Sequence, residues 1–280
     1  MSCPAADIFH QAAKLNRQDP RRKGNVVFLE GKLEVLVSGD IHGHRANLKK
    51  ILNHAAFAKN PDRRVVLQEI VHGPIDPRTG QDRSVDLLLR AARAKVSHGE
   101  QVIFLLANHD VAQATGNEIS KNGLGVCKQF EAGVHHAFED NAADVIAAIN
   151  DFLLSAPLAI RCPNGVLISH SLPGPSRECD IPEHPYLGDD FRRGGAVYEW
   201  TWGRGHGPEH LEKLAAMLGV EFFVVSHVHL ETGWRAIGQK AVIVACDNEH
   251  ACVFRFNSDQ PVDTTSLERY VEPVVALNAL

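Results

Sequence analysis

Residues 33–43 read LEVLVSGDIHG, an apolar run that ends in a turn of glycine and polar residues. The apolar part predicts a strand, and Asp40 and His42 follow it where the chain turns, so both side chains can face one ion. Gly39 and Gly43 permit a close approach of the backbone. Because many loops contain an Asp-x-His pair, the alternative is a strand-end turn whose polar groups are solvated.

Four further polar motifs follow apolar, strand-like runs in the same manner. Each has an ordinary explanation when taken alone: a strand-end glutamate, a helix N-cap, or a histidine satisfied within the fold. As an ordered set, however, they supply carboxylates, an amide oxygen and imidazoles, which are the ligands that two neighbouring divalent metals need. The four motifs are Gln68-Glu69, Asn108-His109-Asp110, Ser169-His170 and Ser226-His227-Val228-His229.

The first half of the chain alternates between apolar strands and amphipathic helices. After the strand at 33–37, helices are predicted over 47–58 and 84–96, and strands over 65–67 and 102–106. This alternation predicts parallel β-α-β units whose strands are buried on both faces. In such sheets the ligand crevice lies beyond the carboxyl ends of the strands, which is where the first three motifs fall.

The second half is predicted to be helical over 111–155 and then to resemble a β-meander, with a long loop over 171–195 near the site. The expected divisions are an N-terminal helix and connector (1–24), a main domain (25–260) and a C-terminal tail (261–280). The remaining predicted elements are a helix at 208–218, a turn joining 26–29 to 33–37, and strands at 26–29, 158–160, 166–168, 222–225, 234–237, 241–246 and 252–256.

Composition narrows the classes of function. The 280 residues are 44% hydrophobic, enough for a full core, and the net charge of −5 argues against a dedicated nucleic-acid binder. We expect neither a signal peptide nor a membrane span, since no apolar run approaches about 20 residues, and hence a cytoplasmic location. Reduced thiols are expected at six scattered cysteines: Cys3, Cys127, Cys162, Cys179, Cys246 and Cys252.

Together the five motifs resemble the signatures of the calcineurin-like metallophosphoesterases, above all the phosphoprotein (Ser/Thr) phosphatase branch, which reads GDIHG, GD-x-x-DRG, GNHE, HGG and GH-x-H. The resemblance spans about residues 33–256, and segments 153–173 and 200–204 look like the branch's approach to HGG and its Trp-rich stretch. It implies an α/β fold, namely an α/β/β/α sandwich of two mixed sheets flanked by helices.

The resemblance also implies a role for each motif residue. Two metal ions (Mn, Fe or Zn) would share a water whose hydroxide attacks phosphorus, and His109 would protonate the leaving oxygen. Glu69 stands where the family places an aspartate that bridges the ions. Asp40, His42 and His229 match the other ligands of one ion, and Asn108, His170 and His227 match those of the second.

The second motif departs from the family pattern. Glu69 replaces aspartate, and the family's aspartate partner of the catalytic histidine is missing, with Asp76 and Asp110 as candidate substitutes. Two phosphate-binding arginines are missing as well, and each lost charge-assisted contact would weaken phosphate binding by about 1.5–3 kcal/mol. The candidate replacements are Arg204 and His72, together with Arg78 and Arg83, which are more typical of surface arginines.

Three hypotheses of function follow from this resemblance and its departures. The first is a metal-dependent phosphomonoesterase acting on a phosphorylated small molecule or a phosphoprotein, including phosphoserine or phosphothreonine. The second is a hydrolase of nucleotide diesters or dinucleoside polyphosphates. The third is a weakly active metal-binding module used for protein interaction, which the altered second motif favours and the intact ligand set disfavours. The sequence carries no signal for an oligomeric state.

Overall fold

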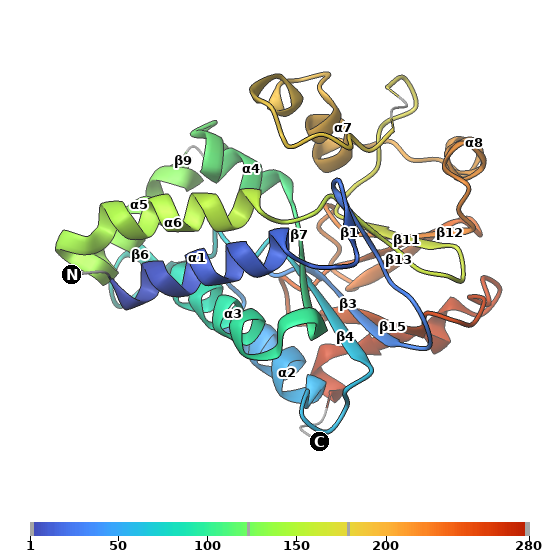
Figure 1. Ribbon diagram of the computed structural model, residues 1–280, viewed down its shortest axis with the longest axis horizontal. Coiled ribbons are helices and arrows are strands. Elements are labelled where there is room, and N and C mark those ends of the chain that lie inside the picture. The colour runs from blue at the N-terminus through green and yellow to red at the C-terminus, as the bar shows by residue number, and fades with distance from the viewer. Residues whose placement is uncertain (1–2, 122–123, 178–179, 278–280) are drawn as a thin grey trace.

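The computed structural model describes residues 3–121, 124–177 and 180–277, and it consists of two stacked β-sheets with helices on the outside (Figure 1). One sheet has seven strands in the order β1-β2-β10-β11-β12-β14-β13, and the other has five in the order β16-β15-β3-β4-β7. Both sheets contain parallel and antiparallel pairs, so the predicted sandwich of two mixed sheets is confirmed.

The five-stranded sheet carries the first three motifs. Its strands β3 (Glu34–Asp40), β4 (Arg63–Gln68) and β7 (Val102–Leu105) run parallel, as the alternation of strands and helices predicts. Strands β15 (Cys252–Asn257) and β16 (Val271–Pro273) complete the sheet with antiparallel pairs. Because β3, β4 and β7 are parallel, their carboxyl ends open on one edge of the sheet.

The seven-stranded sheet carries the last two motifs, at the ends of β11 and β12. The predicted hairpin between β10 and β11 is confirmed by their antiparallel pairing. The strands are β1 (Arg22–Lys23), β2 (Val26–Phe28), β10 (Ala159–Arg161), β11 (Val166–Ser169), β12 (Phe222–Val225), β13 (Trp234–Ile237) and β14 (Ala241–Val244).

Two topological predictions are wrong. Strands β2 and β3, expected as neighbours joined by a turn, lie in different sheets, because buried Leu29 and Leu33 carry the connection through the core between the sheets. The expected β-meander at the end of the chain is also absent among the described residues. After the antiparallel pair β13–β14 the chain crosses to the other sheet, where β15 pairs with β3.

Helices cover the outer faces of the sandwich. Helix α1 packs against α3 and α6 beside the five-stranded sheet, whereas α8 lies on the opposite side of the molecule (Figure 1). The expected loop over 171–195 leads into α7, a short helix that was not predicted from the sequence. The helices are α1 (Pro4–Arg17), α2 (Arg45–Ala55), α3 (Ser84–His98), α4 (Asn108–Thr115), α5 (Val126–Phe138), α6 (Ala142–Leu154), α7 (Ala196–Trp202) and α8 (Pro208–Leu218).

Smaller elements complete the described chain. Two short hairpins stand outside the main sheets, and none of the described helices is both long and apolar enough to cross a bilayer. The five cysteines that the structure describes form no disulfide, and Cys179 lies outside the described residues. The hairpins are β5–β6 (Ile75–Asp76, Gln81–Asp82) and β8–β9 (Ser120–Lys121, Leu124–Gly125), and the 3₁₀-helices are Gly99–Gln101, Glu139–Asn141, Gly188–Phe191, Leu267–Arg269 and Val274–Ala276.

Strand β3 shows why the central strands are apolar on both faces. Val35 and Val37 belong to the core between the two sheets, whereas Leu36 belongs to the core beneath the helices. Side chains alternate across a strand, so a strand covered on both sides needs an unbroken apolar run. The apolar run of β3 ends at Val37, and the strand continues into the buried polar residues Ser38 and Asp40 at the site.

A seam joins the two sheets at the end of β3. There Asp40 bridges to Ala245, just beyond β14, and its carbonyl accepts a hydrogen bond of 3.0 Å from the amide of Cys246. The approach is so close that a Cβ atom on Gly39 would lie 2.2 Å from the carbonyl oxygen of Val244. Gly39 is thus required for the contact that brings Asp40, from one sheet, beside residues of the other.

We expect Gly39→Ala to destabilise the protein by at least about 1–3 kcal/mol, because its Cβ would collide with backbone atoms that cannot rotate away. Urea unfolding monitored by circular dichroism would measure this loss. Gly188→Ala is the matched control, since nothing lies within 4 Å of a Cβ at that position. Equal unfolding midpoints for the two variants would contradict the role assigned to Gly39.

Candidate metal centre

Five strand ends surround one pocket of about 830 Å³. Strands β3, β4 and β7 of one sheet and β12 and β14 of the other are each followed by polar residues that line it, and the buried His170 at the end of β11 lies beneath. The motifs predicted from the sequence therefore converge in space. Those lining the pocket are Asp40, His42, Glu69, His72, Asn108, His109, His227 and His229.

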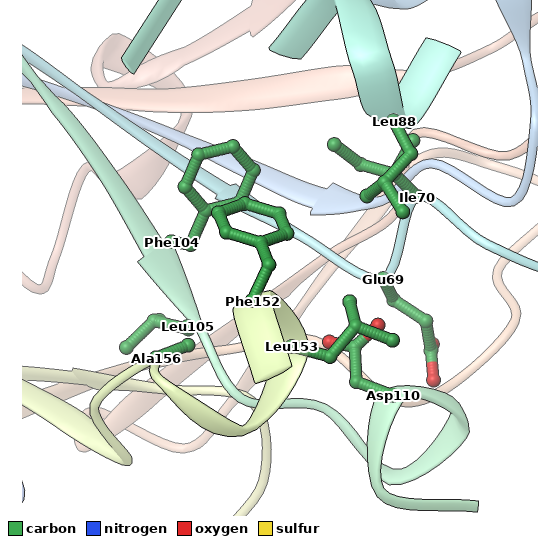
Figure 2. Close-up of a pocket in the computed structure, with 9 residues that line it drawn as sticks. All are labelled: Glu69, Ile70, Leu88, Phe104, Leu105, Asp110, Phe152, Leu153 and Ala156. Atoms are coloured by element: carbon green, nitrogen blue, oxygen red, sulfur yellow. The ribbon is translucent and has the colours of Figure 1, made fainter. Parts of the chain in front are cut away.

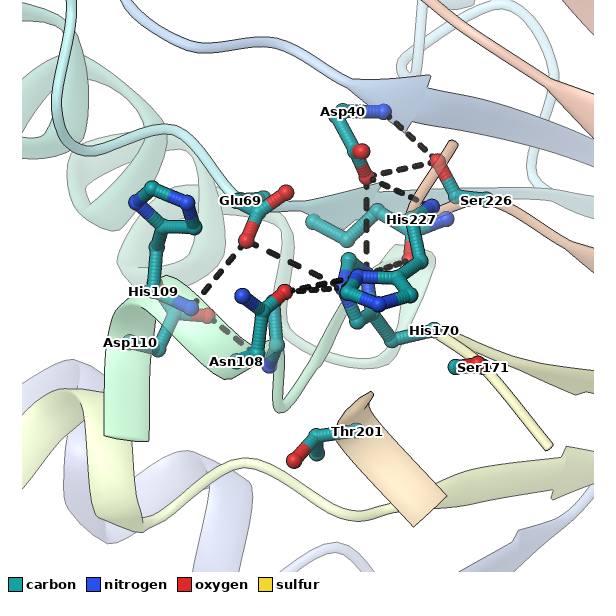
Figure 3. Close-up of polar contacts among 12 residues, drawn as sticks. Asp40, Glu69, Asn108, His109, Asp110, His170, Ser171, Thr201, Ser226 and His227 are labelled. Atoms are coloured by element: carbon teal, nitrogen blue, oxygen red, sulfur yellow. Dashed lines mark hydrogen bonds and ion pairs between the residues drawn. The ribbon is translucent and has the colours of Figure 1, made fainter. Parts of the chain in front are cut away.

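Three ligand atoms converge on a single point inside this site. Asn108 Oδ1 lies 2.8 Å from His170 Nε2 and 2.9 Å from His227 Nδ1, and the two nitrogens are 3.1 Å apart. Figure 3 shows the three side chains directed toward one another. Neighbouring ligands of an ion with bonds of about 2.1 Å are themselves about 3 Å apart, so this spacing matches one coordination sphere.

The side chain of Gln68 orients His170 within this group. Gln68 Nε2 donates to the carbonyl of Ser38 at 2.7 Å, which turns its Oε1 toward His170 Nδ1 at 3.1 Å. An amide oxygen only accepts, so the hydrogen of His170 resides on Nδ1 and the Nε2 lone pair faces Asn108. Burial, followed by the nearby His227, holds the pKa of His170 well below its ordinary value, so the ring is neutral. Opposed lone pairs at this point suit a cation.

Two buried carboxylates flank the imidazoles. Asp40 Oδ1 lies 3.4 Å from His170 Nδ1, and Glu69 Oε2 lies 3.4 Å from His42 Nε2. Burial, and then the negative charge of Glu69, raises the pKa of Asp40 well above its ordinary value. A bound cation would relieve the cost of burying both charges.

Glu69 is shared by two groups of metal-binding type. Among the described residues, Asp40, Glu69 and His170 form one group whose ligand atoms lie within 4.8 Å of one another, and His42, Glu69 and His109 form the other. His42 is oriented by its Nδ1, which donates to the carbonyl of Val71 at 3.1 Å and leaves Nε2 for the site. A carboxylate common to both groups is the arrangement that a bridging ligand requires.

The backbone around the site is held in an uncommon conformation. Four non-glycine residues of the site have positive φ: His42 (41°), Glu69 (46°), His72 (59°) and His227 (66°). Each such residue costs about 1–3 kcal/mol and persists only where the surrounding structure imposes it. This left-handed turn at the strand ends aims successive side chains into the pocket rather than along the sheet.

Ser226 ties the two sheets together at the ligands. Its hydroxyl lies 2.6 Å from Asp40 Oδ1 and accepts a hydrogen bond of 2.8 Å from the Asp40 amide, while the His227 amide donates to the same carboxylate at 3.3 Å. Figure 3 shows these contacts above the histidine cluster. They fix the Asp40 carboxylate before any ligand binds.

His229 occupies a different position from the other predicted ligands. It lines the pocket, but its side chain is 64% exposed and its Nδ1 lies 2.6 Å from Asp247 Oδ2. Within the described part of the chain, neither His229 nor His227 belongs to a group of close ligand atoms, but His227 is buried. The contact with Asp247 leaves Nε2 as the ring nitrogen available to a ligand.

Asp110 and Asp76, the candidate partners of His109, each accept a hydrogen bond from a backbone amide. Asp110 accepts a hydrogen bond from the Ala107 amide at 3.1 Å and borders a small apolar cavity of about 10 Å³ behind Glu69 (Figure 2). Burial raises the pKa of Asp110 to about 7. Asp76 instead accepts from the Arg78 amide in the β5–β6 hairpin. Neither aspartate contacts the His109 ring through a hydrogen bond among those described.

His72 takes that place instead, which differs from its expected role as a substitute for a phosphate-binding arginine. It is buried, its Nδ1 lies 2.7 Å from His109 Nδ1, and its Nε2 lies 2.9 Å from Gln113 Oε1. Both ring nitrogens thus face protein groups, while the residue also lines the pocket. The phosphate-binding role expected for His72 stays a prediction, and these two contacts favour a place beside His109.

Arg204 is the sole arginine among the described residues that line the pocket. It is exposed and follows α7, whose end is held by a hydrogen bond of 2.7 Å from the Ser171 hydroxyl to the Gly203 carbonyl. Arg78 is exposed, the half-buried Arg83 pairs with Asp86 at 2.9 Å, and both arginines lie outside the lining.

Four residues of the site were not predicted from the sequence as functional candidates. Asp247 follows β14 as the other motifs follow their strands, so the same rule would have found it. Gln68 and Ser226 stand inside two of the motifs but lack the chemistry of a metal ligand. Gln113 lies four residues after His109 on α4, the spacing that brings two helical side chains to one face.

Comparisons with known proteins agree with this geometry. A family model described as calcineurin-like phosphoesterase matches residues 33–231, and no curated protein sequence matches the chain. A protein serine/threonine phosphatase from Saccharomyces cerevisiae, with similarity to human phosphatase PP5, superposes with a TM-score of 0.64 at 17% identity, covering 90% of this chain and 81% of its own. A cold-active protein-tyrosine phosphatase of a psychrophilic Shewanella species superposes with a TM-score of 0.57 at 15% identity, covering 88% and 80%. At these identities the structures share a fold.

Proposed function

Because this chain belongs to the calcineurin-like phosphoesterase family, we propose that it hydrolyses phosphomonoesters with two metal ions held at the pocket between its sheets. Membership confirms the resemblance carried by the motifs and makes the chain a metal-dependent phosphoester hydrolase in class. The observation that carries the proposal is the meeting of Asn108 Oδ1, His170 Nε2 and His227 Nδ1 within 3.1 Å.

We divide the ligand atoms between two ions as the resemblance to the family implies. We assign Asp40, His42 and Glu69 to one, with His229 Nε2 as a further ligand, and Asn108, His170, His227 and Glu69 to the other. When bound, such a pair of ions neutralises the phosphate oxygens, orients the ester and makes water acidic enough to react near neutral pH. The ligand set suits Mn, Fe and Zn alike, so the metal that is bound depends on which metal is supplied to the protein.

His109 is assigned as the acid that protonates the leaving oxygen. Its amide donates to Glu69 Oε1 at 3.1 Å, and its ring packs edge-on against His42 with centroids 4.7 Å apart. Figure 3 draws its ring on the far side of Glu69 from His170 and His227. An imidazole in this position can reach an ester oxygen that points away from the Asn108 group.

A direct test is hydrolysis of p-nitrophenyl phosphate and of bis-p-nitrophenyl phosphate by the full chain with added Mn²⁺, together with elemental analysis. Faster turnover of the monoester with about two ions bound would support the proposal. Faster turnover of the diester would instead assign the chain to the nucleotide diesterases. Bound metal without turnover would favour an interaction module, and the absence of bound metal would overturn the whole proposal.

We expect Arg204→Ala to lower kcat/KM for p-nitrophenyl phosphate about 10- to 100-fold, mainly through a higher KM, because one charge-assisted phosphate contact is lost. Steady-state kinetics with saturating Mn²⁺ would measure the change, and Arg204→Lys should keep part of the affinity. Arg78→Ala is the matched control, being exposed and outside the pocket lining. The same KM in both alanine variants would remove Arg204 from the substrate site.

A further inference from the structure

We infer that His72 is the positioning residue of His109, and that Gln113 fixes the tautomer of His72, so that an imidazole here replaces a carboxylate partner. The inference rests on the proposed function for its catalytic meaning, although the hydrogen bonds that carry it stand by themselves. It gives a functional role to His72, Gln113 and Glu131, which do not belong to one sequence motif.

We call the series of hydrogen bonds that leads to His109 the relay, and it begins at a carboxylate on α5. Glu131 Oε1 accepts a hydrogen bond of 3.3 Å from Gln113 Nε2, on α4. A carboxylate can only accept, so the amide nitrogen of Gln113 is turned toward Glu131 and its oxygen is turned toward His72. The Gln113 side chain is buried, so water does not compete for this orientation.

Gln113 then determines which nitrogen of His72 carries the hydrogen. Gln113 Oε1 lies 2.9 Å from His72 Nε2 and can only accept, so Nε2 is the donor. A neutral His72 with its hydrogen on Nε2 presents a bare lone pair at Nδ1. Phe130 packs edge-on against the ring with centroids 5.8 Å apart and restricts its rotation.

The lone pair of His72 in turn orients His109. The two Nδ1 atoms are 2.7 Å apart, a short hydrogen bond in which one must donate and the other accept. Because His72 Nδ1 is the acceptor, His109 donates from Nδ1, and its Nε2 is the nitrogen left for a leaving group. His72 Nδ1 therefore offers what a carboxylate oxygen would offer, one acceptor at a fixed place, without a buried negative charge.

Two features show that this arrangement is imposed by the fold. His72 has a left-handed backbone, with φ of 59°, which a side chain other than glycine adopts only at a cost. The relay also joins three separate segments, the loop after β4, helix α4 and helix α5. A histidine that merely filled space would require neither the strained backbone nor an amide pinned by a carboxylate.

The experiment compares leaving groups in the wild type, His72→Ala and His72→Asp. A proton donor matters little for p-nitrophenolate, which leaves unaided, and greatly for an alkyl alkoxide. We expect His72→Ala to lower kcat for an alkyl phosphate about 10-fold or more while changing kcat for p-nitrophenyl phosphate by less than about 3-fold. His72→Asp should restore alkyl ester turnover, because its Oδ1 stands as many bonds from Cα as Nδ1 of histidine does. Equal losses on both esters, or no rescue by aspartate, would overturn the inference.

A spectroscopic arm does not depend on turnover. Long-range ¹H–¹⁵N correlation of the ¹⁵N-labelled full chain with Zn²⁺ should show His72 with hydrogen on Nε2, and Gln113→Leu should turn this into a mixture of tautomers. Hydrogen on Nδ1 of His72 in the wild type would overturn the inference. The exposed His135 on α5 is the control, and His135→Ala should leave both spectra and rates unchanged. If the wild type hydrolyses no phosphoester, the proposed function fails, and the tautomer of His72 still decides whether the relay exists.

Discussion

Glu69→Gln is expected to lower turnover of p-nitrophenyl phosphate by more than about 100-fold and to release bound metal, since changes to groups that merely orient a ligand already cost about 10- to 100-fold. The size of the effect follows from the position of this carboxylate. Glu69 is assigned to both ions and is the residue shared by both groups of close ligand atoms, so one substitution should weaken the binding of both ions. Metal content by elemental analysis and kcat by steady-state kinetics would be measured on the same sample.

Two further variants serve as comparisons for Glu69→Gln. Glu69→Asp restores the shorter carboxylate of the related signatures and tolerates the left-handed backbone, so it should hold more metal than the glutamine variant. Glu209→Gln changes an exposed glutamate in the first turn of α8 and should match the wild type. If Glu69→Gln kept two ions and full turnover, the assignment of a shared carboxylate would be refuted.

His109→Ala is expected to slow hydrolysis of an alkyl phosphate by about 10²–10⁴-fold, the usual contribution of a general acid. The loss should be much smaller for p-nitrophenyl phosphate, whose leaving group needs no proton. Rates on the two esters at saturating metal would establish the ratio. This dependence on the leaving group is expected to match in kind, and to exceed in size, that of His72→Ala.

The same variant decides between two roles for His109, because its ligand atoms also lie within 4.8 Å of those of His42 and Glu69. An acid can be removed without loss of metal, whereas a ligand cannot. We expect His109→Ala to retain both ions by elemental analysis. Loss of an ion, with equal rate losses on both esters, would make His109 a ligand and would end its assignment as the acid.

Periodicity and strand-end position predicted most of the fold and much of the candidate site. Strands that are apolar on both faces can only sit inside a sandwich, so β3, β4, β7 and β12 were recognisable, and the polar residues after them had to meet at an edge. The local sequence pattern indicates which face of a strand a residue occupies, but it does not indicate which sheet the strand joins. For this reason the sequence did not predict that the chain changes sheets between β2 and β3 and again before β15.

Side-chain direction after a strand end was the second thing that the sequence did not reveal. His42, Glu69, His72 and His227 all have positive φ, a conformation usually expected at glycine, and nothing in their identity announces it. The turn of the His72 side chain toward His109 depends on this backbone. The outward position of His229, paired with Asp247, likewise depends on tertiary neighbours that spacing does not contain.

The seam at Gly39 also constrains how the molecule can move. The assigned ligands come from both sheets, and Ser226 and Cys246 lock the two together right beside Asp40. A hinge motion that opened the two sheets would therefore separate the assigned ligands from one another. The floor of the pocket is expected to stay rigid when a substrate binds. The part of the pocket that can shift when a large phosphoester enters is therefore the rim. It includes Ile75 of the β5–β6 hairpin and Ile119, which directly precedes β8, and neither hairpin belongs to the two main sheets.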